Sequence, residues 1–269
     1  MEIIESYIEG KEINHCDDGL FINDNFIAVI DGVTSKGKFL WDGKKSGEFA
    51  KDVICRELEK LDKEIDAYSA IKQINESIKK SYGDRYLIAE KKVEEKIAAT
   101  IVIFSNFRKE VWIFGDCQCL VNGNHYNDPK KMDRILAEVR SLYINIELLK
   151  GKTKEEISQN DLGREYILPL IREGCRYANK TDTWYRYNVL DGFEIDEKRS
   201  VIIKVNSEDE IVLASDGYPV LKSTLKESEE ILKRILEEDP LFIELYKSTK
   251  GLVKGNKSFD DRTYIRFIV

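Results

Sequence analysis

"FIAVIDGVTSKG" occupies residues 26–37, and its apolar run leads directly into Asp31-Gly32. An apolar run of this length next to turn residues is typical of a buried strand. Asp-Gly after it fits a turn, because both residues are common in turns. It also fits a metal site, because hard cations prefer carboxylate oxygens, and the end of a buried strand holds such a group rigidly. The dipeptide occurs at four further places in the chain, so this stretch does not decide between the two interpretations by itself.

The overall composition narrows the possible partners and the compartment. The chain has 269 residues and a net charge of −7, and its basic residues are mixed with acidic ones. Proteins that bind nucleic acid usually show a basic patch or stripe instead. No stretch approaches the run of about 18 apolar residues that indicates a membrane span, and the acidic N-terminus lacks the basic region of a signal peptide. We therefore expect a cytoplasmic protein with neither nucleic acid nor membrane as a partner.

Cysteine and linker content predict one domain without a disulfide framework. The five cysteines are an odd number and are scattered along the chain, which argues against paired disulfides. Cys117 and Cys119 alternate along a predicted strand and so share one face, where we favour core packing over redox sensing. No linker rich in glycine, serine or proline and no repeat interrupts the sequence. Residues 1–269 are therefore expected to form a single domain.

Apolar periodicity and turn residues predict an α+β fold. Alternating or β-branched runs are typical of strands, and apolar residues three or four positions apart are typical of helices. Strands are expected at residues 2–10, 19–24, 25–31, 98–106, 110–116, 117–123, 183–192, 199–206, 210–217 and 262–269, and helices at 47–61, 68–82, 223–237 and 240–247. The strands come in runs without regular β-α-β alternation, which indicates largely antiparallel sheets with helices packed outside.

Residues 129–178 differ from the rest and are predicted to be helical. Asp128 is expected to cap the first helix of this segment, with Pro129 at its first position. Thr153 begins a capping box for a second, shorter helix. A third helical piece is expected to bend or break at Pro169, because proline removes one backbone donor from the helix.

Carboxylates recur where the predicted strands begin or end. These positions are Asp17 and Asp18, Asp31, Asp116, Asp216, and Asp260 and Asp261. Turn formation alone would mix Asn, Ser and Asp at such sites, whereas here each residue is an aspartate. Asp31 and Asp216 are 185 positions apart, so local structure does not explain the recurrence. Carboxylates that converge from distant strand ends are typical of a site for hard divalent cations.

Taken together and in order, these motifs resemble those of the metal-dependent protein phosphatases of type 2C, the PPM family, over essentially the full length of the chain. The matching stretches are Asp17-Asp18 before a strand, Asp31-Gly32, Gly115-Asp116-Cys117, Ser215-Asp216-Gly217 and Asp260-Asp261-Arg262-Thr263. Each motif alone is weak, and the ordered set is specific. The resemblance implies a four-layer α-β-β-α sandwich of two antiparallel sheets, with helices on both outer faces and a flap-like segment at about 129–178.

The resemblance also implies a bacterial-like hydrolase that removes phosphate from phosphoserine or phosphothreonine in a partner protein, with Mn²⁺ or Mg²⁺ as cofactor. Asp31 would bridge two ions, and the carbonyl of Gly32 would bind one of them. Asp17 or Asp18 would complete the first ion, Asp216 and Asp260 would complete the second, and Asp116 would bind a third, weaker ion. Asp31, Asp216 and Asp260 would thus be the catalytic residues. Two such ions lower the pKa of the water between them, so that hydroxide is available near neutral pH.

Two departures from the family pattern leave alternatives open. The family often has an arginine before the first acidic pair, where this chain has only Lys11, and often a histidine after the Asp-Gly, where it has Val33. His15 beside the acidic pair could supply the missing acid. A catalytically impaired member that binds a phosphorylated partner or regulates it remains an alternative. So does a small-molecule phosphatase whose pocket is shaped by residues 129–178.

Overall fold

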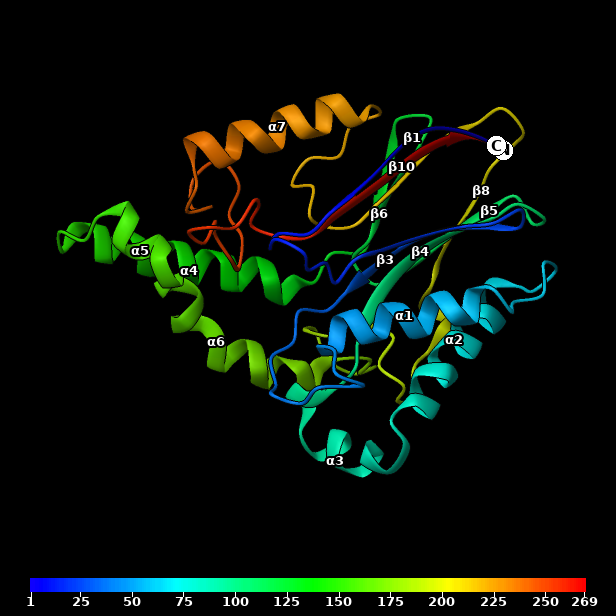
Figure 1. Cartoon of the computed structure of the whole chain (residues 1–269), viewed down its shortest axis with the longest axis horizontal. Coiled ribbons are helices and arrows are strands. Elements are labelled where there is room, and N and C mark those ends of the chain that lie inside the picture. The colour runs from blue at the N-terminus through cyan, green and yellow to red at the C-terminus, as the bar shows by residue number, and fades with distance from the viewer.

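The computed structural model describes residues 1–269, which form two antiparallel five-stranded sheets packed face to face (Figure 1). In one sheet the strand order is β1 (Glu2–Glu9), β10 (Arg262–Ile268), β9 (Glu210–Ala214), β6 (Gln118–Val121) and β7 (Asn124–Asn127). In the other it is β2 (Gly19–Ile22), β3 (Phe26–Gly32), β4 (Ala99–Ser105), β5 (Glu110–Phe114) and β8 (Val201–Lys204). The first and last strands of the chain are neighbours, with Tyr7 opposite Tyr264.

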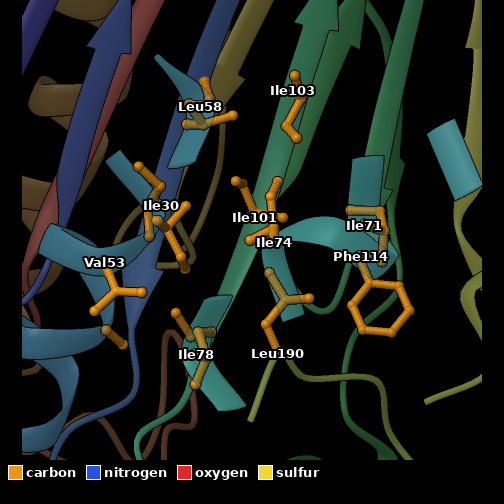
Figure 2. Close-up of a cluster of buried hydrophobic side chains, with 14 of the residues drawn as sticks. Ile30, Val53, Leu58, Ile71, Ile74, Ile78, Ile101, Ile103, Phe114 and Leu190 are labelled. Atoms are coloured by element: carbon orange, nitrogen blue, oxygen red, sulfur yellow. The ribbon is translucent and has the colours of Figure 1, made fainter. Parts of the chain in front are cut away.

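Strand β3 is buried on both faces, which explains its uninterrupted apolar run. Ile27 and Val29 belong to the hydrophobic cluster between the two sheets. The alternate residues, including Ala28 and Ile30, face the helices on the outer side of the same sheet. Figure 2 shows Ile30 in this outer cluster, with side chains from β4 and from the helices around it. The strand therefore lies in the middle of the molecule, and Asp31 is at the C-terminal end of this buried strand.

The helices complete four layers in the order that the family resemblance implies. Helices α1 (Ser46–Leu58) and α2 (Ala67–Ser81) cover the sheet that contains β3, and α7 (Leu225–Glu238) covers the sheet that contains β1 and β10 (Figure 1). A short helix, α3 (Tyr86–Lys91), lies beyond α2. The predicted α+β class with two antiparallel sheets and helices on both outer faces is confirmed.

Helices α4 (Lys131–Leu149), α5 (Lys154–Asn160) and α6 (Leu162–Gly174) project to one side of the sandwich (Figure 1). Thr153 forms the predicted capping box at the start of α5. The predicted cap at Asp128 is wrong, because α4 begins at Lys131 without a side-chain cap. Asp128 instead accepts a hydrogen bond from Asn188 at 3.1 Å. Of the predicted bend or break at Pro169, the break is wrong. Helix α6 continues through this proline, and the carbonyl that loses its partner belongs to an exposed turn where water can replace the missing donor.

Two predicted elements, a strand and a helix, are absent. In each, a polar side chain accepts backbone N–H groups that the strand or helix would have paired. Residues 183–192 form only isolated bridges, and the Asn179 side chain accepts the N–H of Val189 at 3.0 Å. Residues 240–247 do not form a helix. There the Asp239 carboxylate accepts the N–H groups of the three residues 243–245. Conversely, β7 is present although the sequence did not predict it. Its residues are mostly exposed, so they show no apolar pattern.

The remaining sequence predictions concern the cysteines and the membrane. Cys117 and Cys119 are fully buried in the cluster between the sheets, which confirms a packing position for both. All five cysteines are unpaired. None of the helices combines the length and the apolar character needed to cross a membrane.

Candidate metal centre

Three of the predicted metal ligands lie together where strands of both sheets end. Carboxylate oxygens of Asp31, Asp116 and Asp216 all lie within 4.8 Å of one another. Asp31 is the second-last residue of β3, and the other two follow β5 and β9 closely. The same three side chains and Asp260 line a pocket of about 510 Å³. The sandwich thus brings four carboxylates from distant parts of the chain to one cavity.

Asp31 and Asp216 have no basic partner within ion-pair distance, unlike their neighbours. Burial raises the pKa of both carboxyls well above the usual value, and the nearby charges of Asp116 and Asp260 raise it further. Asp18 adds to the shift at Asp31. A carboxylate held in this state favours either a proton or a cation. A divalent ion would therefore be most strongly stabilised at these two carboxylates.

Lysines neutralise the other two carboxylates of the pocket. Lys130 Nζ lies 2.7 Å from Asp116 Oδ2, and Thr100 donates a hydrogen bond to the other oxygen at 2.9 Å. Although burial raises the pKa of Asp116, Lys130 and Thr100 hold it below the usual value. At Asp260, burial also raises the pKa, and contacts from Lys250 and Lys11 lower it below the usual value. An ion at either carboxylate would have to compete with a lysine.

The opening acidic pair lies behind this pocket rather than on its wall. Asp18 is 2% exposed and accepts a hydrogen bond from Thr263 at 3.0 Å, and it is close enough to Asp31 to raise its pKa. Asp17 is 1% exposed, and its Oδ1 lies 3.2 Å from Nε2 of His15. This contact does not have hydrogen-bond geometry, and both atoms lack another partner. Between the two, Asp18 is the better placed to share an ion with Asp31.

Glycine follows the aspartate at two strand ends because the backbones there touch. A Cβ on Gly32 would lie 2.4 Å from the carbonyl oxygen of Asp17 and 2.6 Å from that of Gly47. A Cβ on Gly217 would lie 2.0 Å from the carbonyl oxygen of Asp261. No side chain fits at such distances. These contacts place the acidic pair beside Asp31 and the last acidic stretch beside Asp216.

The structure shows the surroundings of the residues at the two departures from the family pattern. Lys11 is buried and donates to Asp261 at 2.8 Å, which raises its pKa despite the opposing effect of burial. Its ammonium is therefore occupied by the protein's own carboxylates. Val33 lines the pocket and has no proton to donate. His15 does not line the pocket, and its Nδ1 lies 3.6 Å from Glu48, so the structure gives no support to an acid role for it.

The sequence reading missed Lys130 and Lys250, which contact two of the proposed ligands. Lys130 follows Pro129 at the start of the helical segment, and Lys250 lies in the loop after α7. Neither position belongs to a motif, and no periodic pattern indicates it. Only the chain path shows that these two lysines reach the acidic pocket.

The metal-free protein is expected to lose stability as pH rises through the neutral range. Asp18, Asp31 and Asp216 have folded-state pKa values raised above their unfolded value. Above the unfolded pKa of about 3.9, the folded chain therefore binds more protons than the unfolded chain, and the free energy of unfolding falls with pH until the raised pKa values are passed. Asp116 and Asp260 have lowered pKa values, so their stabilisation is lost only at pH values below that window.

Thermal unfolding in EDTA at pH 5.5 and 7.5 tests this. We expect the higher Tm at pH 5.5, and a smaller difference once Mn²⁺ is added. A Tm in EDTA that rises with pH across this window would contradict the prediction.

Comparison with known proteins gives structural similarity only. No family model matches the chain, and no curated protein sequence matches it. The serine/threonine phosphatase PstP/Ppp of Mycobacterium tuberculosis is 14% identical with a TM-score of 0.49, covering 99% of this chain and 98% of its own. RsbX in complex with magnesium is 13% identical with a TM-score of 0.47, covering 98% and 97%. The serine/threonine phosphatase Stp1 of Staphylococcus aureus is 18% identical with a TM-score of 0.46, covering 98% and 94%. The function proposed below therefore rests on this chain's own residues.

Proposed function

We propose that this chain is a hydrolase of phosphate monoesters that uses two Mn²⁺ or Mg²⁺ ions, with phosphoserine and phosphothreonine in proteins as its substrates. The observation that supports it most is the group of three carboxylates within 4.8 Å of one another. Asp31 and Asp216 in this group have raised pKa values and no basic partner. Such a group is costly to maintain unless cations offset it.

The charge of the centre matches two divalent ions. Seven carboxylates surround it, and three lysines contact three of them. The carboxylates are Asp17, Asp18, Asp31, Asp116, Asp216, Asp260 and Asp261, and the lysines are Lys11, Lys130 and Lys250. Four negative charges remain without a lysine, which two divalent cations would offset.

The proposed ligands follow from position and charge. Asp31 would bridge the two ions, and the carbonyl of Gly32 would bind one of them together with Asp18 or, less directly placed, Asp17. Asp216 and Asp260 would hold the second ion, which would compete with Lys11 and Lys250 at Asp260. Asp116 would bind a third ion only weakly, because Lys130 already occupies one of its oxygens at 2.7 Å.

The chemistry divides between the ions and the chain. Bound at this centre, the ions would lower the pKa of a water molecule and neutralise the phosphoryl oxygens. Asp31, Asp216 and Asp260 would position these charges, and the walls of the 510 Å³ pocket would exclude bulk water. Val33 offers no general acid in this pocket. Good leaving groups, which need no protonation, should then react faster than serine or threonine.

Two further features complete the proposal. Residues 129–178 would act as the flap of a single domain, since Lys130, Met132, Asp133 and Arg164 of this segment line the pocket. Five unpaired cysteines favour a reducing, cytoplasmic setting, and the net charge of −7 argues against nucleic acid as a partner.

The test is hydrolysis of para-nitrophenyl phosphate as a function of Mn²⁺ concentration. We expect turnover that saturates with Mn²⁺ and disappears in EDTA. Parallel assays with a phosphothreonine peptide and with small phosphorylated metabolites then compare kcat/KM between substrate classes. A higher value for the peptide supports a protein substrate, and a higher value for a metabolite transfers the proposal to small molecules. Tight Mn²⁺ binding without any turnover would contradict the enzymatic function and favour a phospho-partner-binding module.

A further inference from the structure

Two half-buried basic side chains line the pocket without a carboxylate partner. The basic residues on its wall are Lys36, Lys96, Lys130, Arg134, Arg164, Lys247 and Lys250. Four of them pair with carboxylates, namely Lys96, Lys130, Lys247 and Lys250. Arg134 is exposed at the rim. Lys36 and Arg164 are half-buried and form no ion pair, so they are the cations inside the pocket that remain free for a ligand.

Each side chain is linked to Asp260 through one residue and a neighbouring lysine. Lys36 Nζ donates to the carbonyl of Thr34 at 2.9 Å. The hydroxyl of the same threonine accepts from Lys11 at 3.2 Å, and that ammonium lies 3.3 Å from Asp260. On the other side, Arg164 Nη1 donates to the carbonyl of Thr249 at 3.1 Å, and the next residue contacts Asp260. The two free cations thus approach one edge of the metal centre from the loop after β3 and from helix α6.

The electrostatics of this edge favour an anion. The pKa of Lys36 is lowered to about 8, mainly by burial; Cys175 opposes this shift, and the charges of Arg164, Lys130 and Lys250 contribute to it. Burial also lowers the pKa of Arg164, although Asp133, Asp161 and Asp260 partly oppose this. A partly buried cation without a partner is unfavourable. An anion between Lys36 and Arg164 would remove the repulsion and supply both with hydrogen bonds.

We propose that Lys36 and Arg164 form an anion subsite that binds the phosphoryl oxygens of a phosphate monoester dianion at the edge of the metal centre. The identity of the anion rests on the proposed function. Lys11, Lys130 and Lys250 do not serve this purpose, because carboxylates occupy them. A guanidinium binds two phosphoryl oxygens side by side, and an ammonium adds a point charge. The subsite thus assigns phosphate binding to a residue of the loop after β3 and a residue of α6.

Binding of inorganic phosphate to the Mg²⁺-loaded full chain, measured by titration calorimetry, tests the subsite. Lys36→Met and Arg164→Met are each expected to weaken phosphate binding about 10-fold, and the double variant about 100-fold. Arg164→Lys should restore part of the loss. Lys38→Met and Arg172→Met are matched controls, because both side chains are exposed and lie outside the pocket, and they should bind phosphate like the wild type. The number of Mg²⁺ ions bound and the Tm should not change in any variant.

The outcomes separate this proposal from the proposed function. Wild-type protein that binds phosphate through these two residues and hydrolyses no ester retains the subsite and overturns the function. Metal-dependent hydrolysis with unchanged KM and unchanged phosphate affinity in the double variant overturns the subsite and retains the function. Wild-type protein that does not bind phosphate at millimolar concentration also overturns the subsite. Loss of phosphate affinity in Lys38→Met or Arg172→Met to the same degree would show that the effect is not specific to this pair.

Discussion

Asp216→Asn is expected to reduce metal-dependent hydrolysis of para-nitrophenyl phosphate by about 10³-fold or more. A catalytic ion contributes several kcal/mol of transition-state stabilisation, and each 1.4 kcal/mol is about tenfold in rate. Asp216 has no basic partner and lies within 4.8 Å of Asp31 and Asp116, so an uncharged amide there removes charge from the centre itself. The measurement is kcat over a range of Mn²⁺ concentrations, together with Mn²⁺ affinity by calorimetry.

The same substitution should have the opposite effect on the metal-free protein. Burial and the charges of Asp31, Asp116 and Asp260 raise the pKa of the Asp216 carboxyl, so its removal relieves repulsion and should raise the Tm in EDTA at pH 7.5. Asp84→Asn is the matched control, because this aspartate is exposed and makes no side-chain contact, and it should change neither activity nor Tm. A variant at Asp216 that keeps more than a tenth of wild-type turnover would exclude this residue from the catalytic centre.

Arg140→Met is expected to lower the free energy of unfolding by about 3–5 kcal/mol, because it leaves a buried carboxylate without its cation. Arg140 has no exposed surface. Its guanidinium donates to Asp161 at 2.7 Å and to the carbonyl of Leu241 at 2.8 Å. The Asp161 carboxylate also accepts the N–H of Gly251 at 2.8 Å. The arginine therefore joins α4 to the start of α6 and to the loop that holds Lys250.

Urea denaturation with matched denaturant slopes measures this loss. Arg134→Met on the same helix is the control, since its side chain is exposed, and it should change the free energy of unfolding by no more than about 0.5 kcal/mol. A loss below about 1 kcal/mol for Arg140→Met would show that the buried network does not hold the segment. Because Arg164 and Thr249 lie on the two parts that Arg140 joins, the KM for para-nitrophenyl phosphate should also rise.

Much of the fold could be predicted from the sequence because its determinants are local. The apolar run of β3 indicates a strand that is buried on both faces, and the helical spacing of Phe49, Val53, Ile54 and Leu58 indicates α1. The Thr153 capping box is likewise a property of a few neighbouring residues. Two predictions failed where a polar side chain near the predicted element bound its backbone. Asn179 binds the N–H of Val189 in place of a strand partner.

The candidate site divides in the same way. The recurrence of aspartate at predicted strand ends is visible in the sequence, and with it the set of carboxylates that the structure brings towards one pocket. The sequence does not show which of these carboxylates pair with a lysine and which do not. That Lys130 pairs with Asp116 and Lys250 with Asp260, while Asp31 and Asp216 have no cation, depends on how α4 and the loop after α7 approach the sandwich.

The reason is that charge compensation is a property of distances in space, whereas strand and helix patterns are properties of neighbours along the chain. The apolar patterns were sufficient for the strands of largely antiparallel sheets, and the position of aspartate at strand ends for the acidic set. The arrangement in two packed sheets was implied only by the family resemblance. Gly32 and Gly217 show the difference within one dipeptide. The dipeptide by itself left a turn and a metal site open, and the structure shows backbone contacts with Asp17 and Asp261. Tertiary packing alone decided which carboxylates are free to bind a metal ion. It also decided which two cations, Lys36 and Arg164, are free to bind an anion.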